Sequence, residues 1–395
     1  MINSKNAFLF IGGSNSHLPF IEAANNLNFF TVVFDLNNDC SGKKKSDKFY
    51  NISTHNFDEI LKACEEISFN LKIKGVITYS SASAAHFVVC KIREVYNLPK
   101  NDLSLLETLN DKELQKKLFL KFNIPSPCSY LANNYEESVK ISDHIGYPLI
   151  IKPHSDSQGS LGVRYVKDSF SLEKCFHESF LNSKNGKVLI EKFSNGQEFS
   201  VDGVVISEKI HILSICKKHT LGPNNGFIIE GFETALLNHQ HTKEITELSI
   251  KTLQTFKVKN SFFSLDIIKD GNEFMVIECG NLLDCMIDRM LFYNEIDVYK
   301  LAIKMFSNIV VDKIFDPIQN YSAMRLIYSY DNGILKINSN HNLTSIIEWH
   351  KKDGDKICKP SSVADLVCIS ILENSTKTNY MNLIDLNTKK LFKVL

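Results

Sequence analysis

Two acids on one predicted hairpin constrain this chain more than any other feature. The apolar run 262–268 carries Asp266, the run 273–278 ends at Glu278, and an Asp-Gly pair lies between the two runs. Asp-Gly in such a place predicts an antiparallel hairpin, which would bring the two carboxylates together. Neighbouring carboxylates repel each other unless a cation lies between them, and hard oxygen ligands suit Mg²⁺ held partly by substrate phosphates. Considered alone, an ordinary hairpin with two solvated acids explains the pattern equally well.

A lysine followed by a loop of small residues is the second feature. The apolar run 147–153 contains Lys152, residues 155–162 are rich in Ser and Gly, and 163–166 is predicted to be another strand. Such a loop can bring backbone N–H groups against phosphate oxygens, and the lysine adds a positive charge. The loop lacks the Gly-Lys-Ser/Thr of a P-loop. By itself, such a loop is more typical of a plain surface turn.

The order of the motifs carries more information than any one of them. Two further predicted strands, 187–193 and 196–205, lie between the lysine strand and the acidic hairpin. This order resembles the ATP-grasp superfamily, from about residue 111 to about residue 288. The resemblance implies a nucleotide site for ATP, with these residues: Lys112, Lys152, Ser160, Gly162, Glu191, Lys192, Phe193 and Glu198.

Each of these residues takes a role from the resemblance alone. The two lysines would contact the nucleotide, Lys152 at its phosphates, and the loop with Ser160 and Gly162 would close as a lid. The backbone of 191–193 would meet the adenine edge, and Glu198 would accept from the ribose hydroxyls.

The metal ligands and the acyl-binding group are also implied by the resemblance. Asp266 and Glu278 resemble the carboxylates that hold Mg²⁺ or Mn²⁺. The family often continues as Glu-x-Asn-x-Arg, but here Asn281 is displaced by one residue and the arginine is absent. Asn281 would reach the metal if the turn is shifted. The candidates to replace the arginine, which supports a developing oxyanion, are these: Arg289, Lys217, His219 and Arg325.

The implied reaction is that of an ADP-forming carboxylate–amine ligase, similar to the L-amino-acid ligases. Such an enzyme activates a carboxylate as an acyl phosphate, and an amine then displaces the phosphate. Two alternatives remain open. One is another acyl-phosphate chemistry of the carboxylase or purine-pathway type, and the other is a non-catalytic or regulatory ATP-binding relative. The implied partners are a small carboxylate and an amine, with a homodimer as a possible assembly.

The expected fold is α/β with three parts. Strands alternate with helices over 1–110, which predicts a parallel sheet covered by helices. Residues 111–317 are expected to form a two-lobed ATP-grasp domain with a lid at about 125–192. A helix near 298–303 would close this middle domain, and 318–395 would form a small β-rich C-terminal domain.

Composition excludes several other classes of protein. Lys plus Arg and Asp plus Glu both number 45 among 395 residues, so the basic excess typical of nucleic-acid binding is missing. No apolar run is long enough for a membrane span, and no secretory signal is visible. The ten cysteines form no Cys-x-x-Cys pair. We therefore expect a cytoplasmic protein with reduced thiols and no membrane partner.

Overall fold

The chain begins with a parallel sheet of buried strands. The computed structural model describes residues 6–154, 160–311, 315–338, 345–375 and 391–395, and of 373–375 only the backbone. The sheet has the order β3-β2-β1-β4. Its central strands β1 and β2 are buried along almost their whole length because helices cover both faces. The elements are β1 (Asn6–Ile11), α1 (Leu18–Asn26), β2 (Phe30–Phe34), β3 (Lys48–Tyr50), α2 (Phe57–Ser68), β4 (Lys72–Ile77) and α3 (Ser83–Val95).

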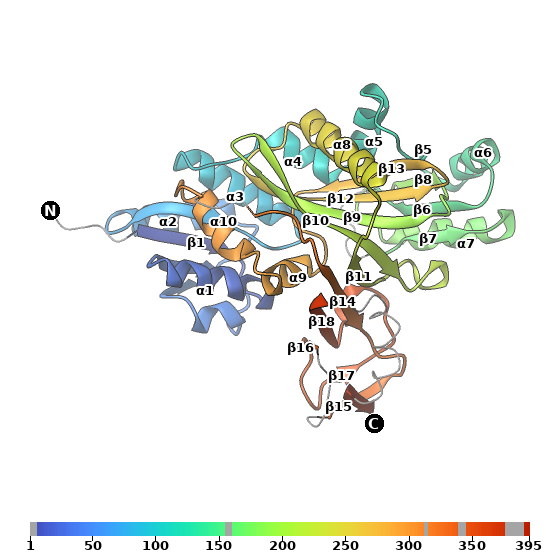
Figure 1. The fold of residues 1–395 in the computed structure, drawn as a ribbon. Helices are drawn as coiled ribbons and strands as arrows, with labels where there is room; N and C mark the ends of the chain where they lie inside the picture. Colours follow the sequence, from blue (N-terminus) through green and yellow to red (C-terminus); the bar gives the residue numbers. More distant parts are fainter. Residues whose placement is uncertain (1–5, 155–159, 312–314, 339–344, 376–390) are drawn as a thin grey trace.

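A helix from much later in the sequence completes this unit. Helix α10 (Val298–Phe306) packs on α1 and β4, beside the short helix α9 (Ile287–Tyr293). In Figure 1 α10 accordingly lies over the blue part of the chain. The expectation that this helix closes the middle domain is therefore corrected. Its apolar side chains, such as Leu301, share one buried cluster with Phe8 and Phe20.

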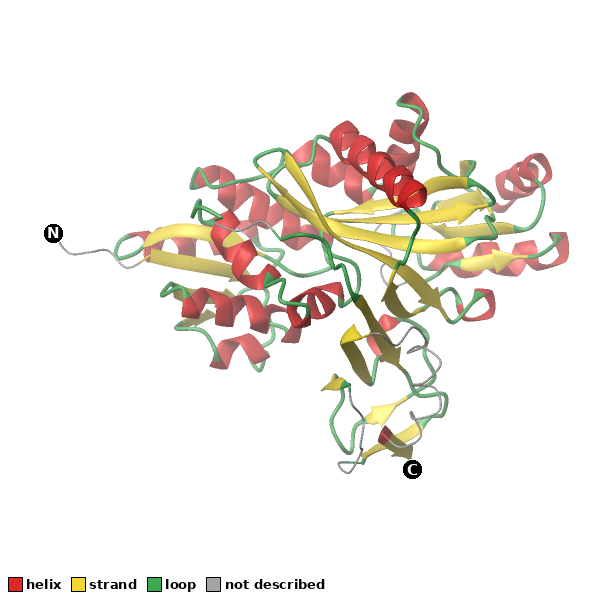
Figure 2. Cartoon of the chain, in the orientation of Figure 1, coloured by secondary structure: helices red, strands yellow, loops and turns green. Residues whose placement is uncertain are grey.

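The centre of the molecule is an eight-stranded sheet in the order β13-β12-β9-β10-β11-β14-β18-β16. The helices over the β12–β13 end of this sheet are α4 (Leu103–Asn110), α5 (Lys112–Lys121) and α8 (His239–Phe256), shown in Figures 1 and 2. The strands are β9 (Gln197–Ile206), β10 (Lys209–Thr220), β11 (Ile229–Thr234), β12 (Ser261–Asp270), β13 (Glu273–Gly280), β14 (Tyr321–Ile327), β16 (Ile346–Trp349) and β18 (Cys368–Ser375).

A second, smaller lobe lies within the region predicted to be a lid. Its antiparallel sheet has the order β5-β8-β6-β7 and carries two helices. Asn134 and Asp168 cap these helices, each by accepting a hydrogen bond from a backbone N–H of the first turn. The elements are β5 (Ser129–Ala132), α6 (Tyr135–Ile145), β6 (Leu149–Pro153), β7 (Arg164–Val166), α7 (Ser169–Leu181) and β8 (Val188–Lys192).

The last part of the chain is β-rich, as expected, but it continues the large sheet. Strand β14 pairs with β11 and with β18, which in turn pairs with β16. In the described part of this region, the strands of a separate small sheet are β15 (Gly333–Ile337), β17 (Lys356–Ile357) and β19 (Phe392–Val394). The domain boundaries after residues 110 and 317 stay predictions.

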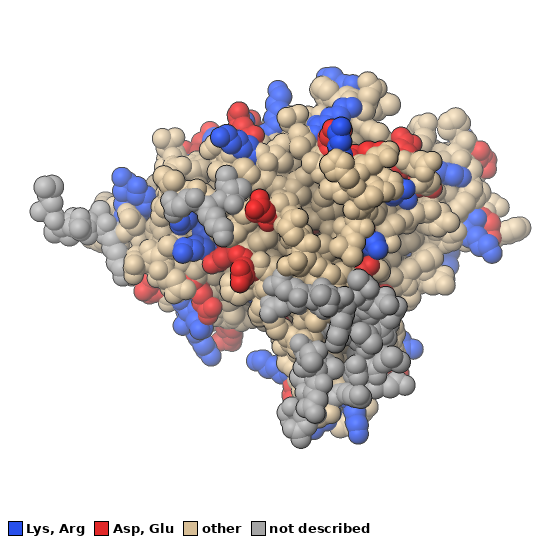
Figure 3. Space-filling model, in the orientation of Figure 1, with Lys and Arg blue, Asp and Glu red and all other residues tan. Residues whose placement is uncertain are grey.

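Charged side chains of both signs are interspersed on the face shown in Figure 3, in keeping with the balanced composition. Among the described residues, no helix has both the length and the apolar character that a membrane crossing requires.

Candidate active site

A β-bulge brings the two acids of the hairpin onto one face. Asp266 lies directly opposite Glu278, whereas Ile267 lies opposite Val276, so Ile277 is the extra residue. Side chains alternate along a strand, so a regular register would place Ile277 opposite Asp266 and turn Glu278 to the other face. The bulge absorbs one residue and returns Glu278 to the side of Asp266. The sequence predicted the hairpin but not this irregularity.

The same face of the large sheet carries a row of polar side chains. In the strand register, Ser200 lies opposite Asp266, and Glu198 lies opposite both Ile268 and Lys218. Because directly paired residues share a face, these side chains stand together, and we call this side the polar face. The alternate residues of β9 and β12 are apolar and pack under α4, α5 and α8. Helices thus bury one face and leave the other for polar chemistry.

Lys218 lies between two carboxylates of the polar face. Its Nζ lies 2.8 Å from Asp266 Oδ1 and 2.9 Å from Asp284 Oδ2. The backbone N–H of Asp284 donates a 2.7 Å hydrogen bond to Asp202 Oδ1. Neither Lys218 nor Asp284 was among the predicted site residues. The period-two alternation along β10 would have singled out Lys218 if the register had been known.

The carboxylates around Lys218 outnumber the positive charges beside them. Burial, together with the negative charges of Asp284 and Glu198, raises the pKa of Asp266 well above its usual range despite the nearby Lys218. Burial and Asp284 likewise raise the pKa of Asp202 to about 7. Carboxylates that resist ionisation in this way are stabilised by an additional cation. The oxygen-only donors Asp266 and Glu278 therefore fit Mg²⁺ or Mn²⁺.

Glu278 also faces a lysine at the start of α5. Lys112 Nζ lies 3.5 Å from Glu278 Oε1. Burial opposes ionisation of Glu278, but the charges of Lys112 and Lys152 outweigh it and lower the pKa. Glu278 is thus held as a carboxylate, the form that a metal ion requires.

A buried carboxylate joins the lid to the larger lobe. Glu191 on β8 lies 2.6 Å from Lys152 Nζ on β6 and 2.8 Å from Lys116 Nζ on α5. Burial opposes its ionisation, but the two lysines lower the pKa of Glu191 to about 2. Lys116 was not predicted, although it lies one helical turn after Lys112 and so shares its face of α5.

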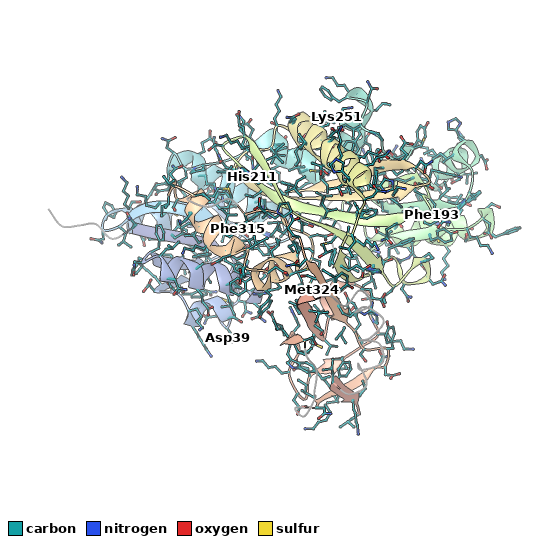
Figure 4. The ribbon with its side chains drawn as sticks, viewed as in Figure 1. Asp39, Phe193, His211, Lys251, Phe315 and Met324 are labelled. Atoms are coloured by element: carbon teal, nitrogen blue, oxygen red, sulfur yellow. The ribbon has the colours of Figure 1, made fainter. Side chains whose placement is uncertain are left out.

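A single cleft of about 420 Å³ unites these groups. The volume lies within the usual range of small-molecule sites. Figure 4 labels Phe193 where the lid sheet approaches the large sheet. Nine of the predicted residues line the cleft: Lys112, Lys152, Ser160, Glu191, Lys192, Phe193, Glu198, Asp266 and Glu278. Lys218 and Asp284 line it as well.

Comparisons with known proteins point to one family. A family model described as "Carbamoyl-phosphate synthase L chain, ATP binding domain" matches residues 111–284. The carbamoyl phosphate synthase large chain of Clostridium acetobutylicum is 24% identical over 270 residues, which cover 66% of this chain and 24% of that protein. By this match, residues 111–284 form an ATP-grasp domain.

Solved structures share the fold over almost the whole chain. The L-amino acid ligase of Bacillus licheniformis matches with a TM-score of 0.79 and 16% identity, and the match covers 99% of this chain and 98% of that one. The biotin carboxylase domain of the 2-oxoglutarate carboxylase of Hydrogenobacter thermophilus matches with a TM-score of 0.77 and 15% identity, covering 99% and 90%. At these identities the likeness shows the ATP-grasp fold, not the substrates.

The residues predicted to bind the nucleotide differ in detail from expectation. The amides of Lys192 and Phe193 already donate to Cys128 O (2.9 Å) and Pro148 O (3.2 Å), so they are engaged within the lid. The Lys192 ammonium donates to two backbone carbonyls of the lid. An adenine ring at the predicted strand would have to use other backbone atoms than these two amides.

The loop after Lys152 approaches the large sheet. Ser160 Oγ donates a 3.2 Å hydrogen bond to Phe227 O, in the connection between β10 and β11. Gly162 has a φ of 79°, and a Cβ at this position would lie 2.7 Å from Pro153 Cγ. Backbone conformation and packing therefore explain why this residue is a glycine. Residues 155–159 of the predicted loop lie outside the described residues.

Asn281 is not among the residues that line the ATP-grasp cleft. Its Nδ2 lies 3.2 Å from His86 Nδ1, and it lines a different, smaller cavity. Gly280, one residue earlier, does line the cleft. The chain thus turns away from Asp266 and Glu278 before it reaches the displaced asparagine.

Two of the candidates for the missing arginine face away from the polar face. Lys217 and His219 flank Lys218 on β10 and lie 3.5 Å and 3.4 Å from Glu233 Oε1. Because side chains alternate along the strand, the residue between them is the one that reaches Asp266. This placement corrects the expectation that Lys217 and His219 act in the cleft.

The two arginine candidates are also held outside the cleft. Arg289 donates to Tyr299 OH at 3.1 Å, and its Nε lies 3.4 Å from Glu348 Oε2 of β16. Arg325 pairs with Glu230. Neither guanidinium lines the cleft, whereas Lys218 does and lies beside Asp266, one of the two predicted metal ligands.

Proposed function

We propose that this protein is an ATP-dependent carboxylate–amine ligase that forms an amide or peptide-like bond through an acyl phosphate, with release of ADP and phosphate. One observation carries the proposal. The opposed carboxylates Asp266 and Glu278 share a cleft with Lys112, Lys152 and Lys218. Phosphoryl transfer from ATP needs this combination of metal ligands and cations, because its rate depends on positioning and charge neutralisation.

Some cleft residues would bind the nucleotide, and others would bind the metal ion. Lys112 and Lys152 would bind the polyphosphate, while Asp266 and Glu278 would hold Mg²⁺, which neutralises phosphate charge when bound. A substrate carboxylate oxygen attacks the γ-phosphorus, and ADP leaves. The amine nitrogen then attacks the acyl carbon, phosphate leaves, and the amine gives up a proton to water.

Lys218 would act where the acyl group reacts. Its ammonium is fixed by Asp266 and Asp284 at the wall of the cleft. A fixed cation in a low-dielectric site stabilises the oxyanion that develops as the amine attacks. This role replaces that of the arginine missing after Glu278.

Two observations support the choice of amide formation, and one favours an alternative. The acid-rich end of the cleft, with Asp284 and Glu198, suits a protonated amine, and the amino acid ligase fold extends over the whole chain. Conversely, the sequence relative of Clostridium acetobutylicum is a carbamoyl phosphate synthase. The second candidate function is therefore an acyl-phosphate reaction that begins from bicarbonate.

Phosphate release from Mg-ATP tests the proposal. The protein is assayed with paired small carboxylates and amines and, separately, with bicarbonate, and Glu278→Gln serves as the blank. Release that requires one carboxylate–amine pair and vanishes in the variant supports the ligase. Release that requires bicarbonate alone supports the second candidate. ATP that stays bound and unchanged, without Mg²⁺ dependence, supports a non-catalytic relative.

The homodimer and the cytoplasmic location also remain proposals. The biotin carboxylase domain that shares the fold is described as a dimer. Light scattering of the purified protein would give its mass in solution, and a monomer would exclude the dimer.

A further inference from the structure

A small cavity lies behind the turn that follows the acidic hairpin. It has a volume of about 40 Å³ and lies where β4 and α3 of the first sheet meet β12. Asn281 lines this cavity, whereas the preceding Gly280 lines the large cleft. Its polar lining includes Thr78, His86, Arg93, Asn101 and Ser261. The cavity is thus separate from the nucleotide site but close to Glu278 in the chain.

The guanidinium of Arg93 is a buried charge at this cavity. Arg93 is 7% exposed, its Nε donates to Val76 O at 2.9 Å, and its Cζ lies 3.7 Å from the centroid of the Phe306 ring. Among the described residues, no carboxylate forms an ion pair with it. Fully buried arginines are almost always paired, because an unpaired charge in the interior is costly. The ring face offsets part of that cost but supplies no negative charge.

The other groups at the cavity do not neutralise Arg93. His86 Nε2 lies 2.6 Å from the carbonyl oxygen of Ser80, so it carries the proton, and Nδ1 accepts from Asn281. Burial lowers the pKa of His86 to about 4, which keeps the ring neutral. No Asp or Glu is among the residues that line the cavity in the described chain. The lining therefore has one positive charge and several neutral hydrogen-bonding groups.

The geometry points to a buried site for one small planar oxyanion, a carboxylate or bicarbonate, bound by Arg93. A guanidinium presents parallel N–H donors that match such an anion, and the polar lining supplies further partners. The volume accommodates an anion of a few heavy atoms and excludes a nucleotide or sugar phosphate. This site does not depend on the proposed reaction, because none of its residues lines the large cleft.

Anion-dependent stability tests the site without any assay of activity. The midpoint of urea unfolding is measured in increasing formate, bicarbonate or chloride, for the unsubstituted protein, Arg93→Met and Arg164→Met. Arg164 is the control because it pairs with Glu178 at a half-exposed position. A ligand that binds only the folded state raises the midpoint with the logarithm of its concentration.

We expect formate or bicarbonate to raise the midpoint in the unsubstituted protein and in Arg164→Met, but not in Arg93→Met. The stronger of the two responses identifies the source of the oxyanion. An equal response in Arg93→Met overturns the site, and an equal response to chloride overturns its assignment to an oxyanion.

A second variant keeps the test decisive if Arg93→Met does not fold. Asn281→Asp places a fixed carboxylate on the wall of the same cavity. We expect this variant to show no response to formate or bicarbonate, because its own carboxylate neutralises the cavity. A response as large as that of the unsubstituted protein would contradict the proposal.

Discussion

Glu191 Oε2 and Lys152 Nζ lie 2.6 Å apart inside the lid, and the second oxygen of Glu191 reaches Lys116 on α5. The sequence assigned this glutamate to a strand whose backbone meets adenine. In the structure, its side chain instead pairs with two buried lysines and thereby connects the two lobes.

Replacing that carboxylate should therefore destabilise the fold. Glu191→Gln removes the ion-pair partner of two buried ammonium groups, so we expect the free energy of unfolding to fall by about 3–5 kcal/mol. Urea unfolding measures the change. Glu178→Gln, which breaks the more exposed pair with Arg164, is the control and should cost at most about 1 kcal/mol. Similar losses in both variants would show that Glu191 has no special structural role.

The raised pKa of Asp202 predicts a pH-dependent stability. Its pKa is 3.8 in the unfolded chain and about 7 in the folded protein, so the folded state holds a proton that the unfolded state has lost between these values. This contribution to stability is complete below about pH 3.8 and is lost as the pH rises towards 7. We expect Asp202→Asn to gain stability relative to the unsubstituted protein across this window.

Unfolding of both proteins from pH 4 to pH 8 measures the difference. Asp202 Oδ2 accepts from Ser200 Oγ at 2.6 Å, and an asparagine can keep hydrogen bonds at both positions. A difference that does not change with pH would show that Asp202 ionises normally.

The opposed acids predict a specific loss of metal dependence. Asp266→Asn and Glu278→Gln should keep the fold, because both side chains are partly exposed in the cleft, but should lower Mg²⁺-dependent turnover by about 10²-fold or more. Asp270→Asn, at the tip of the same hairpin, is the matched control. Mg²⁺ titrations of ATP binding and phosphate release provide the measurement. Full activity in either acid variant would remove that residue from the metal site.

Two adjacent lysines on β10 offer a sharper comparison. Lys218→Met removes the cation beside Asp266 and Asp284, so we expect turnover to fall by about 10²-fold. Lys217→Met alters the opposite face, where the lysine pairs with Glu233, and should keep turnover close to that of the unsubstituted protein. The two rates are compared at saturating ATP. The reverse order of effects would restore Lys217 as the catalytic candidate.

The sequence predicted the acidic hairpin because its pattern is local. An Asp-Gly turn between apolar runs was enough to place Asp266 and Glu278 on paired strands. It could not show that the two share a face, because this depends on the one-residue bulge at Ile277. Lys218 was missed, and Lys217 and His219 were expected in the cleft, for a related reason. A strand's face is fixed by its register with its neighbours, and a shift of one residue exchanges the two faces.

Parts of the fold that depend on contacts between distant segments could not be predicted from local patterns either. The pattern of α10 identifies an amphipathic helix, but not that its apolar face covers α1 rather than the middle domain. Similarly, β14 has the sequence of a buried strand, and only its partner β11 shows that it extends the large sheet. Local patterns specify which face is buried but not what covers it.

The position of α10 has a consequence for the order in which the protein is made. The first sheet is complete in sequence at Ile77, but one of its covering helices starts at Val298. At about 5–20 residues per second, a ribosome needs on the order of ten seconds or more to reach that helix. During this interval the nascent first unit exposes apolar surface that the finished protein hides. We therefore expect chaperones to bind nascent chains that end before α10, and to release them once that helix has emerged.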